Sequence, residues 1–329
     1  MASKRNRDGG DTERAHNSSD EHHKRLAGTD GSIDGGSDGS YHDDEVGHCH
    51  LRVGDYIDAR YRFIRQGGKG TFGLVLLCED EKYKKLVAVK VVRKIRKYLE
   101  SARAESCILR DLVRADPDDK GFCVRILNSF EWRGHFCIVF EPLGISLYDL
   151  VKANHFNPMP LYAVQAFADQ VVAAVVFLHR MGLIHTDLKL ENILLGDMNP
   201  LQKSHRTVHL RKKIMVSMPM STSIKLIDFG GAAYFFEQGN GVICTRQYRA
   251  PEIILNFGWG RASDVWSLGC ILMELYTGNL LFQTVRQPPP IFPALPHLTM
   301  KTTMHSLCAS HNTQISFTSP PTPLSLCVA

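Results

Sequence analysis

The sequence predicts an α+β fold in two lobes, with a small β-rich lobe over residues 56–140 and a helical lobe over residues 141–284. Short apolar and β-branched runs, separated by Gly-rich or charged turns, predict the strands of the first lobe. Apolar residues at helical spacing over 162–181, followed by Gly182 as a C-cap, predict a long helix in the second lobe. A Glu-Pro-Leu-Gly break at 141–144 predicts the connector between the lobes, because Pro and Gly this close do not fit a central strand.

The composition narrows the class of protein. A chain of 329 residues with 44% hydrophobic content is long enough for one or two hydrophobic cores. Its formal net charge is +5, and the first fifty residues are acidic, so the rest of the chain is basic and suited to polyanionic ligands without specifying one. Nine cysteines without C-x-x-C pairing predict free thiols, and not a disulfide framework or a zinc site. The hydrophilic start predicts no signal peptide, and the longest apolar run, 171–178, is too short to span a bilayer.

Both ends of the chain and one internal stretch lack the patterns of regular elements. Residues 1–55 are rich in Gly, Ser, Asp and His and predict a disordered tail, because so few apolar groups cannot offset the entropy of ordering. Residues 199–223 hold five Lys and Arg and no acid, which favours a solvated basic loop over a docking site for an anionic partner. Residues 285–329 contain eight prolines and no Asp or Glu, so we expect no helices there.

A glycine-rich turn joins the first two predicted strands, 62–65 and 74–78. Gly68, Gly70 and Gly73 form a G-x-G-x-x-G pattern, which by itself is common to dinucleotide-binding folds and to ordinary turns. Here a strand follows the pattern instead of a helix. This order disfavours a dinucleotide-binding fold and favours a hairpin lid whose backbone amides approach phosphates.

The next strand, 86–92, contains Lys90 in an apolar setting. A buried ammonium is costly unless it is paired, so we expect a partner carboxylate. Glu105, within a helical pattern over 98–113, is the candidate, and the alternative is that Glu105 is a surface acid of that helix. Two further strands are predicted at 124–130 and 136–140.

Residues 184–195 place an acid, a cation and an amide between apolar flanks. Asp187 has the chemistry to accept a hydroxyl proton, Lys189 to neutralise phosphate, and Asn192 to bind Mg²⁺, and phosphoryl transfer requires these three functions. Asp228 ends the short strand predicted at 224–227 and is followed by Phe and Gly, as suits a second metal ligand.

Five motifs in this order make residues 60–284 resemble a eukaryotic protein kinase. They are the glycine motif at 68–75, Val-Ala-Val-Lys at 87–90, the loop at 184–195, Asp-Phe-Gly at 228–230 and the stretch 245–252. The finer resemblance is to the LAMMER, or CDC2-like, dual-specificity kinases, because His185-Thr186-Asp187-Leu188-Lys189 has that group's threonine where arginine is usual. The stretches 136–141 and 244–252 and the insertion before Asp228 are similar to that group as well.

The resemblance implies ATP and Mg²⁺ as ligands and gives each motif a role. The three glycines would cover the triphosphate, and Lys90, held by Glu105, would bind its α and β phosphates. Asp187 would orient the substrate hydroxyl and accept its proton, with Lys189 stabilising the transferred phosphate and Thr245 bracing both. Asn192 and Asp228 would hold Mg²⁺. The positions implied around the adenine and at the hinge are Val75, Ala88, Phe140, Glu141, Leu143 and Leu194.

The activity implied is transfer of the ATP γ-phosphate to Ser and Thr hydroxyls of proteins, with Tyr and Ser/Arg-rich substrates added by the group resemblance. No direct contact with nucleic acid and no membrane association are expected, and the oligomeric state stays open. The basic run at 4–7 is either a nuclear address or a solvated cluster, so a nuclear or cytoplasmic location is expected, with nuclear favoured. Thr186 predicts activity without phosphorylation of the activation segment, because the usual arginine pairs with that phosphate.

Three features depart from the family pattern. Gly67 stands where an apolar residue is usual, and Leu190 replaces a proline. After residue 284 the family's remaining helices are missing, which predicts a helical lobe without its last helices and an uncovered face on the helix that begins near Asp264. A truncated product is the expectation. The alternative function is therefore a catalytically weak kinase-like module that binds ATP or substrates without efficient turnover.

Overall fold

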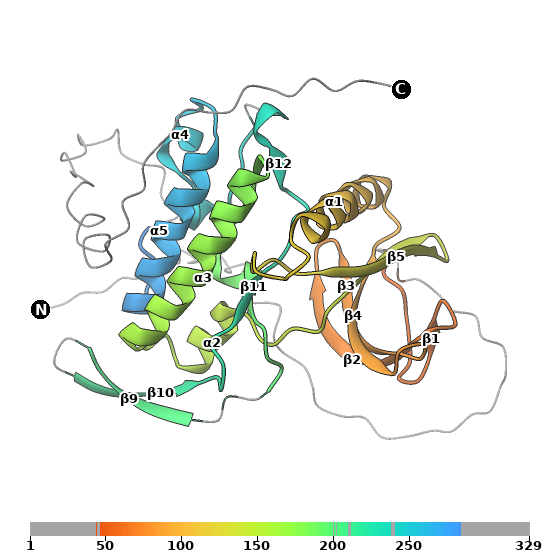
Figure 1. The fold of residues 1–329 in the computed structure, drawn as a ribbon, viewed down its shortest axis with the longest axis horizontal. Coiled ribbons are helices and arrows are strands. Elements are labelled where there is room, and N and C mark those ends of the chain that lie inside the picture. Colours follow the sequence, from red (N-terminus) through yellow and green to blue (C-terminus); the bar gives the residue numbers. More distant parts are fainter. Residues whose placement is uncertain are drawn as a thin grey trace, which may run out of the picture.

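The computed structural model describes residue 44 and residues 47–199, 201, 203–209, 212–237 and 241–283 (Figure 1). The predictions for residues 1–43 and for 284–329 lie outside these ranges. Residues 47–55 are described, and they pack on the first lobe, where Cys49 is 7% exposed and Leu51 lies against the same apolar cluster. The predicted disorder therefore does not extend to residues 47–55, because these two side chains give the segment an apolar face.

The first lobe is a six-stranded antiparallel sheet in the order β1-β2-β3-β4-β6-β5. Its strands are β1 (Tyr56–Ile57), β2 (Tyr61–Gly70), β3 (Gly73–Asp80), β4 (Lys85–Val92), β5 (Ile126–Trp132) and β6 (His135–Phe140). Alternate residues of β4, namely Val87, Val89 and Val91, are buried in a core on one face of the sheet. Helix α1 (Arg96–Ala115) packs against β4, β5 and β6.

The glycine-rich turn is longer and more regular than the sequence indicated. β2 continues to Gly70 and pairs with β3 from Gly73, so the glycines lie at the tip of a β-hairpin. The pairing contains an irregularity between Gln66 and Gly68. A Cβ atom at Gly73 would collide with the Val91 carbonyl, so only glycine allows this close approach of β3 to β4.

The second lobe is built on α3 (Leu161–Arg180), which contacts α5 (Arg261–Thr277), β7 (Leu183–Ile184) and β11 (Ile224–Leu226). Gly182 follows α3 with φ of +78°, the left-handed conformation that lets the chain turn into β7. The other elements are α2 (Leu147–Ala153), α4 (Pro251–Ile254), β8 (Ile193–Leu195), β12 (Ala233–Tyr234) and 3₁₀ turns at Leu190–Asn192, Phe235–Glu237 and Arg246–Tyr248. β8 pairs with β11, and β7 pairs with β12.

Helix α3 also meets the length and composition of a membrane span. Its apolar residues Phe167, Ala174 and Leu178 are fully buried in the core of the second lobe. A core helix of this kind passes the same test, so the finding is weak support for a membrane segment.

The basic insertion forms a β-hairpin, and the predicted loop is wrong here. β9 (Lys203–His209) and β10 (Lys212–Met218) pair along their whole length. Val216 and Met218, two residues apart on β10, are each 2% exposed and join the core of the second lobe. The Asn154 side chain accepts from the Ser217 amide at 2.6 Å and donates to its carbonyl at 2.9 Å. The alternating buried residues Val216 and Met218 thus anchor the hairpin, although the basic residues of the insertion had indicated a loop.

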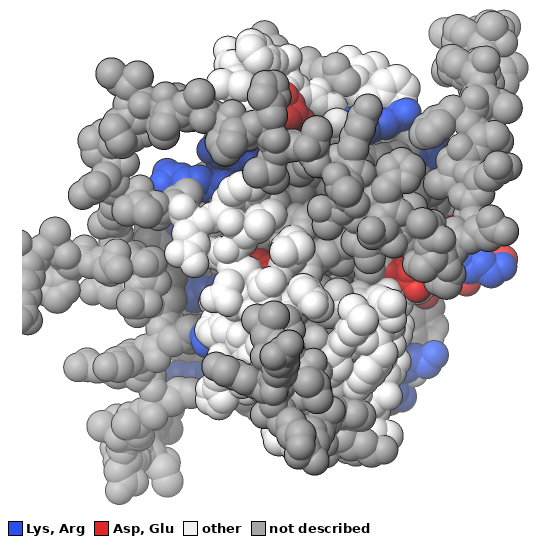
Figure 2. Space-filling view, turned by 90° about the vertical axis from the view of Figure 1, so that its left-hand side faces the viewer, with Lys and Arg blue, Asp and Glu red and all other residues white. Residues whose placement is uncertain are grey.

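Three apolar residues of helix α5 are exposed. Val265, Met273 and Tyr276 are 42%, 36% and 40% exposed. Figure 2 looks at the molecule from the α5 side and shows that the described surface there is mostly uncharged. Glu252 of α4 accepts a hydrogen bond from Ser263 at 3.1 Å.

Candidate active site

Lys90 and Glu105 meet in the interior between β4 and α1. The Lys90 ammonium donates to both carboxylate oxygens of Glu105, at 3.0 and 2.8 Å, and lies 3.9 Å from an Asp228 oxygen. Burial by itself would lower the pKa of Lys90, but the charges of Glu105 and Asp228 outweigh it, and the pKa is raised. Lys90 is therefore a cation at neutral pH, and the alternative of Glu105 as a surface acid is excluded because its side chain is 4% exposed.

The residues predicted around the adenine lie on neighbouring strands. Val75 is the cross-strand partner of Lys90, and Ala88 is the partner of Phe140, so the register brings these side chains close together on β3, β4 and β6. They occupy the face of the sheet opposite Val87, Val89 and Val91, because side chains alternate along a strand. Cβ atoms at Gly68 and Gly70 would meet no atom within 4 Å, so there is open space beside the hairpin tip.

The connector between the lobes carries the predicted hinge positions. In the described part of the chain, the Glu141 carbonyl and the Leu143 amide have no hydrogen-bond partner, as a ligand-binding edge requires. Gly144 donates to the Leu195 carbonyl at 2.8 Å, and Leu194 forms a bridge with Ser146, so β8 lies beside the connector. The structure thus brings Leu143 and Leu194 from distant parts of the chain to neighbouring positions.

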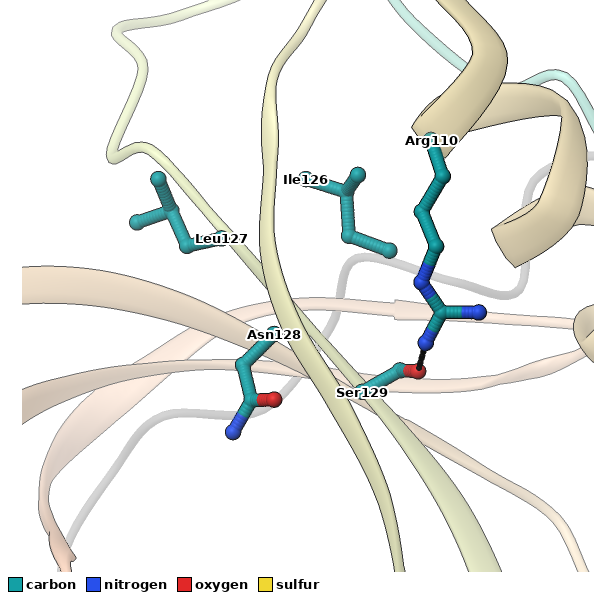
Figure 3. Close-up of a pocket in the computed structure, with 5 residues that line it drawn as sticks. All are labelled: Arg110, Ile126, Leu127, Asn128 and Ser129. Atoms are coloured by element: carbon teal, nitrogen blue, oxygen red, sulfur yellow. Dashed lines mark hydrogen bonds between the residues drawn. The ribbon is translucent and has the colours of Figure 1, made fainter. Parts of the chain in front are cut away.

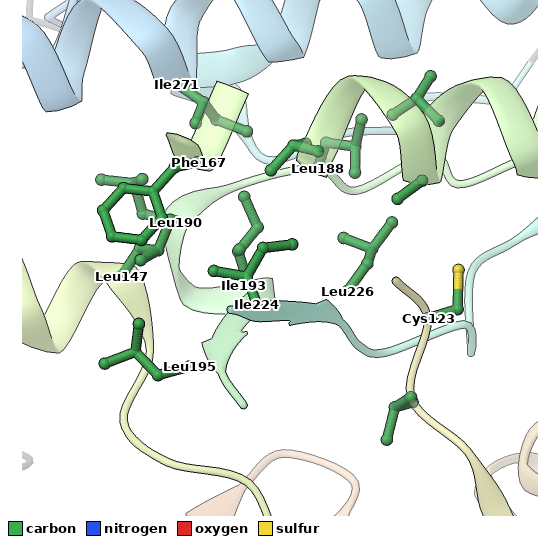
Figure 4. Close-up of a cluster of buried hydrophobic side chains, with 14 of the residues drawn as sticks. Cys123, Leu147, Phe167, Leu188, Leu190, Ile193, Leu195, Ile224, Leu226 and Ile271 are labelled. Carbon is green, nitrogen blue, oxygen red and sulfur yellow. The ribbon is translucent and has the colours of Figure 1, made fainter. Parts of the chain in front are cut away.

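The loop around Asp187 is anchored in the core of the second lobe by its apolar side chains. Leu188 and Leu190 are fully buried and point into the apolar cluster shown in Figure 4, together with Ile193. The polar residues Asp187 and Lys189 alternate with them and are partly exposed. This alternation fixes the loop and explains how Leu190, the departure from the family pattern, is accommodated.

Asp187 is the centre of a short hydrogen-bond network. One carboxylate oxygen accepts from the Thr245 amide at 2.9 Å and its hydroxyl at 2.8 Å, and the other accepts from Lys189 at 2.7 Å. Lys189 also donates to the Thr245 hydroxyl at 3.1 Å. Burial opposes ionisation of Asp187, but the bonds from Lys189 and Thr245 prevail and lower its pKa. Asp187 is therefore an oriented carboxylate at neutral pH.

Asn192 and Asp228, the predicted metal ligands, flank this network. The Asn192 side-chain nitrogen donates to the Asp187 carbonyl at 2.9 Å, which directs its oxygen elsewhere. Asp228 has a left-handed φ of +66°, and its side chain is one-third exposed. No cluster of three His, Cys, Asp or Glu suited to a metal occurs among the described residues. Two protein oxygens do suit Mg²⁺, which commonly takes its remaining ligands from phosphates and water.

Two residues with structural roles at this site were missed by the sequence reasoning. His185 is fully buried and bonds the Ile227 carbonyl at 3.0 Å, just before Asp228. Asp264, 1% exposed at the start of α5, accepts from the backbone amides of His185 and Thr186 at 2.9 and 3.0 Å. The available signal for His185 was a polar residue placed directly after the apolar pair Leu183–Ile184.

A second buried lysine, Lys225, lies behind the connector. It forms ion pairs with Asp119 and, at 3.5 Å, with Glu141, and it donates to the Cys123 carbonyl at 3.4 Å. Glu141 also accepts from the Arg125 amide at 2.9 Å. Glu141 was predicted at the hinge, and its side chain in addition ties the connector to β11.

A shallow recess between α1 and β5 lies apart from this site (Figure 3). Arg110 reaches across it and donates to the Ser129 hydroxyl, with Ile126, Leu127 and Asn128 completing the lining. None of the predicted site residues lines this recess.

The comparisons with known proteins identify the family. A family model described as the protein kinase domain matches residues 61–314. The chain belongs to the protein kinase family. Human dual specificity protein kinase CLK2 is 42% identical over 246 residues, covering 74% of this kinase chain and 48% of CLK2. Serine/threonine-protein kinase AFC1 of Arabidopsis thaliana is 44% identical over 246 residues, covering 74% of this chain and 52% of AFC1.

These relatives place the kinase chain among the LAMMER and CDC2-like kinases, as the threonine of the catalytic loop indicated. A crystal structure of another kinase domain is 44% identical, with a TM-score of 0.70, and covers 74% of this chain and 71% of that one. The bilobal kinase fold is thereby confirmed. The chain spans about half the length of the two curated relatives described above.

Proposed function

We propose that this chain transfers the γ-phosphate of ATP to Ser and Thr hydroxyls of protein substrates. The observation that carries the proposal is the arrangement of Asp187, Lys189 and Thr245, together with the Lys90–Glu105 pair beside Asp228. A held carboxylate, a cation beside it and a second cation near the metal ligands are the groups that phosphoryl transfer uses.

The nucleotide is bound by backbone and cation contacts. The hairpin tip at Gly68 and Gly70 leaves room for phosphates to approach its amides, and Lys90 donates to the α and β phosphates. The Glu141 carbonyl and the Leu143 amide bind the adenine edge, with Val75, Ala88 and Leu194 on its faces.

Asn192 and Asp228 fit a Mg²⁺ ion bound together with ATP. The Asn192 oxygen and the Asp228 carboxylate supply hard oxygen ligands, and the bond from Asn192 to the Asp187 carbonyl fixes the direction of the amide. Held by these two residues, Mg²⁺ would supply positive charge near the phosphate oxygens and so favour attack by a hydroxyl.

Asp187 orients the substrate hydroxyl and accepts its proton at a carboxylate oxygen. Because the pKa of Asp187 is lowered, it is a weak base, and most of its contribution is orientation of the nucleophile. Lys189 stays within reach of both Asp187 and Thr245 and stabilises charge on the transferred phosphate.

The substrate class follows from resemblance. Lys189 in the catalytic loop supports Ser and Thr as acceptors, and the name of CLK2 as a dual specificity kinase supports Tyr as a further acceptor. The same resemblance to CDC2-like kinases supports Ser/Arg-rich proteins as substrates.

A second candidate is a kinase-like module that binds ATP or substrates with little turnover. The exposed apolar residues Val265 and Met273 of α5 favour it, since a lobe whose core helix exposes apolar side chains is less rigid around the catalytic loop.

Phosphorylation of a Ser/Arg-rich protein by the 329-residue chain with Mg²⁺ and ATP distinguishes the two. Asp187→Asn should lower the rate by at least about 100-fold, while the exposed-site control Asp118→Asn leaves it within about twofold. Equal incorporation by wild type and Asp187→Asn would remove the kinase proposal. Nucleotide binding without any Asp187-dependent transfer would establish the second candidate.

A further inference from the structure

Thr186 is the residue of the catalytic loop whose role the proposed function leaves unexplained. It is 4% exposed and has a left-handed φ of +71°. A β-branched residue in this conformation is strained, and it persists only where its surroundings fix it from several sides. The surroundings of Thr186 do so.

Three separate segments bond to Thr186. Its amide donates to Asp264 of α5 at 3.0 Å, and its carbonyl accepts from the Cys244 amide at 2.9 Å. Its hydroxyl donates to the Gly231 carbonyl at 2.7 Å. The two backbone bonds are open to any residue, so the hydroxyl bond is the contribution of the threonine side chain.

Gly231 belongs to the segment 228–231, which begins with the metal ligand Asp228. Gly230 and Gly231 are exposed, and apart from one turn bond, from the Ala232 amide to the Phe229 carbonyl at 3.1 Å, the segment has no regular structure. The Gly230 carbonyl accepts from Ser101 of α1 at a longer 3.4 Å. The bond from Thr186 is therefore the shorter of the two side-chain bonds that hold these consecutive carbonyls.

The bond also connects the two halves of the proposed chemistry. Thr186 adjoins Asp187, and Cys244, which bonds its carbonyl, adjoins Thr245, which holds the Asp187 carboxylate. One short path thus leads from the metal-ligand segment through the Thr186 hydroxyl to the carboxylate that receives the proton.

We propose that Thr186 is a positioning residue whose hydroxyl holds the segment 228–231, and with it Asp228, in the geometry that binds Mg²⁺ with the nucleotide. The role in phosphoryl transfer rests on the proposed function, whereas the tether itself does not. Because the hydroxyl is neutral and its acceptor is a backbone carbonyl, the tether needs no anionic partner, a phosphate on the activation segment included.

Thr186→Ser and Thr186→Ala form a matched pair, since both remove the β-branch and relieve the same strain, and only Ser keeps the hydroxyl. In the full chain, the Mg²⁺ concentration for half-maximal binding of the fluorescent nucleotide mant-ATP should rise about threefold to tenfold in the Ala variant over the Ser variant, the size expected for one hydrogen bond. Amide hydrogen exchange of residues 228–232 should be faster in the Ala variant.

Ser101→Ala serves as the control for the weaker bond and should shift the Mg²⁺ requirement by less than about twofold, given its 3.4 Å distance. If the Ala variant fails to fold, Thr186→Val against wild type gives the same comparison with the branched shape kept.

Equal Mg²⁺ requirement and equal exchange in the hydroxyl-bearing and hydroxyl-free members of the pair would overturn the tether. Binding of mant-ATP needs no turnover, so an inactive chain that still shows the difference would refute the kinase proposal and keep the tether. If no variant binds nucleotide, the exchange comparison alone decides.

Discussion

Two lysines of this kinase chain are buried in apolar strands, and their surroundings differ. Lys90 of β4 is 17% exposed and pairs with Glu105, which is 4% exposed. Lys225 of β11 is 10% exposed and pairs with Asp119, which is 38% exposed, and with Glu141. A buried ammonium requires carboxylate partners in both places, and the difference lies in the partner: Glu105 is buried, whereas Asp119 is partly exposed.

The two lysines also contact different parts of the chain. Lys90 lies 3.9 Å from Asp228, the proposed metal ligand, and its side chain is 17% exposed. Lys225 joins the connector and the loop after α1 to the strand that ends just before Asp228. The comparison teaches that burial and pairing alone do not mark a lysine of the active site. Its position relative to the other proposed site residues does, and only Lys90 lies beside Asp228.

Lys90→Met is the largest test of this difference. Removing the cation that binds the phosphates should lower phosphoryl transfer by at least about 100-fold, measured as initial rate at saturating substrate. Lys85→Met, an exposed lysine of the same strand, is the matched control and should leave the rate within about twofold. A variant at Lys90 with wild-type rates would break the distinction between the two lysines.

Lys225→Met should act first on stability. It leaves Glu141 and Asp119 without their shared cation, and because Asp119 is partly exposed we expect a loss of about 2 kcal/mol in the free energy of unfolding. Urea unfolding monitored by fluorescence measures it, and the transfer rate should fall by less than about tenfold. A rate loss as large as that of Lys90→Met, with stability unchanged, contradicts the structural role.

A third lysine, Lys189, pairs with Asp187, the carboxylate proposed to accept the proton. The bond that Thr245 donates to the same carboxylate gives a test of this pair. Thr245→Val removes one hydroxyl bond from Asp187, so the lowered pKa of Asp187 should rise towards its ordinary value. Activity carried by the ionised form is lost as pH falls through this pKa. The acidic limb of the pH–rate profile should therefore move to higher pH in the variant, and an unchanged limb would separate Thr245 from Asp187.

Asp119→Asn should give the smallest effect, below about 1 kcal/mol in unfolding free energy. Asn suits the left-handed φ of +58° at this position, so the substitution removes the charge with little change in backbone preference. Glu141 remains to pair with Lys225. A loss equal to that of Lys225→Met would show that Asp119 is the main partner.

The sequence predicted Lys90 and missed Lys225 for a physical reason. Lys90 belongs to a motif with fixed spacing, and Glu105 follows on the next helix. The partner Asp119 lies 106 residues from Lys225, and no local pattern reports such a contact. Lys225 also lies between apolar residues, in Ile-Lys-Leu at 224–226. The rule that an interior lysine needs a carboxylate partner therefore predicts a partner for Lys225, but it does not identify which acid.

Other differences have the same origin. The two lobes, the long helix and strands β2 to β6 and β11 were predictable because apolar periodicity is local. The hairpin at Lys203–His209 and Lys212–Met218 was not, since its anchor, Asn154, lies in a different part of the chain. The contact of Thr186 with Gly231 likewise depends on how two loops meet in space. The identity of residue 186 indicated only that the usual arginine is absent.

The distribution of thiols has a practical consequence for following motion in this molecule. Of the seven cysteines in the described ranges, Cys107 of α1 is exposed and the other six are buried. Burial raises the pKa of several of them, to about 12 for Cys78 and Cys123, which keeps them protonated and unreactive. With Cys308 and Cys327 replaced by Ser, a thiol-reactive fluorophore would label α1 at one site. Such a probe would report directly on how the helix that carries Glu105 shifts when nucleotide binds.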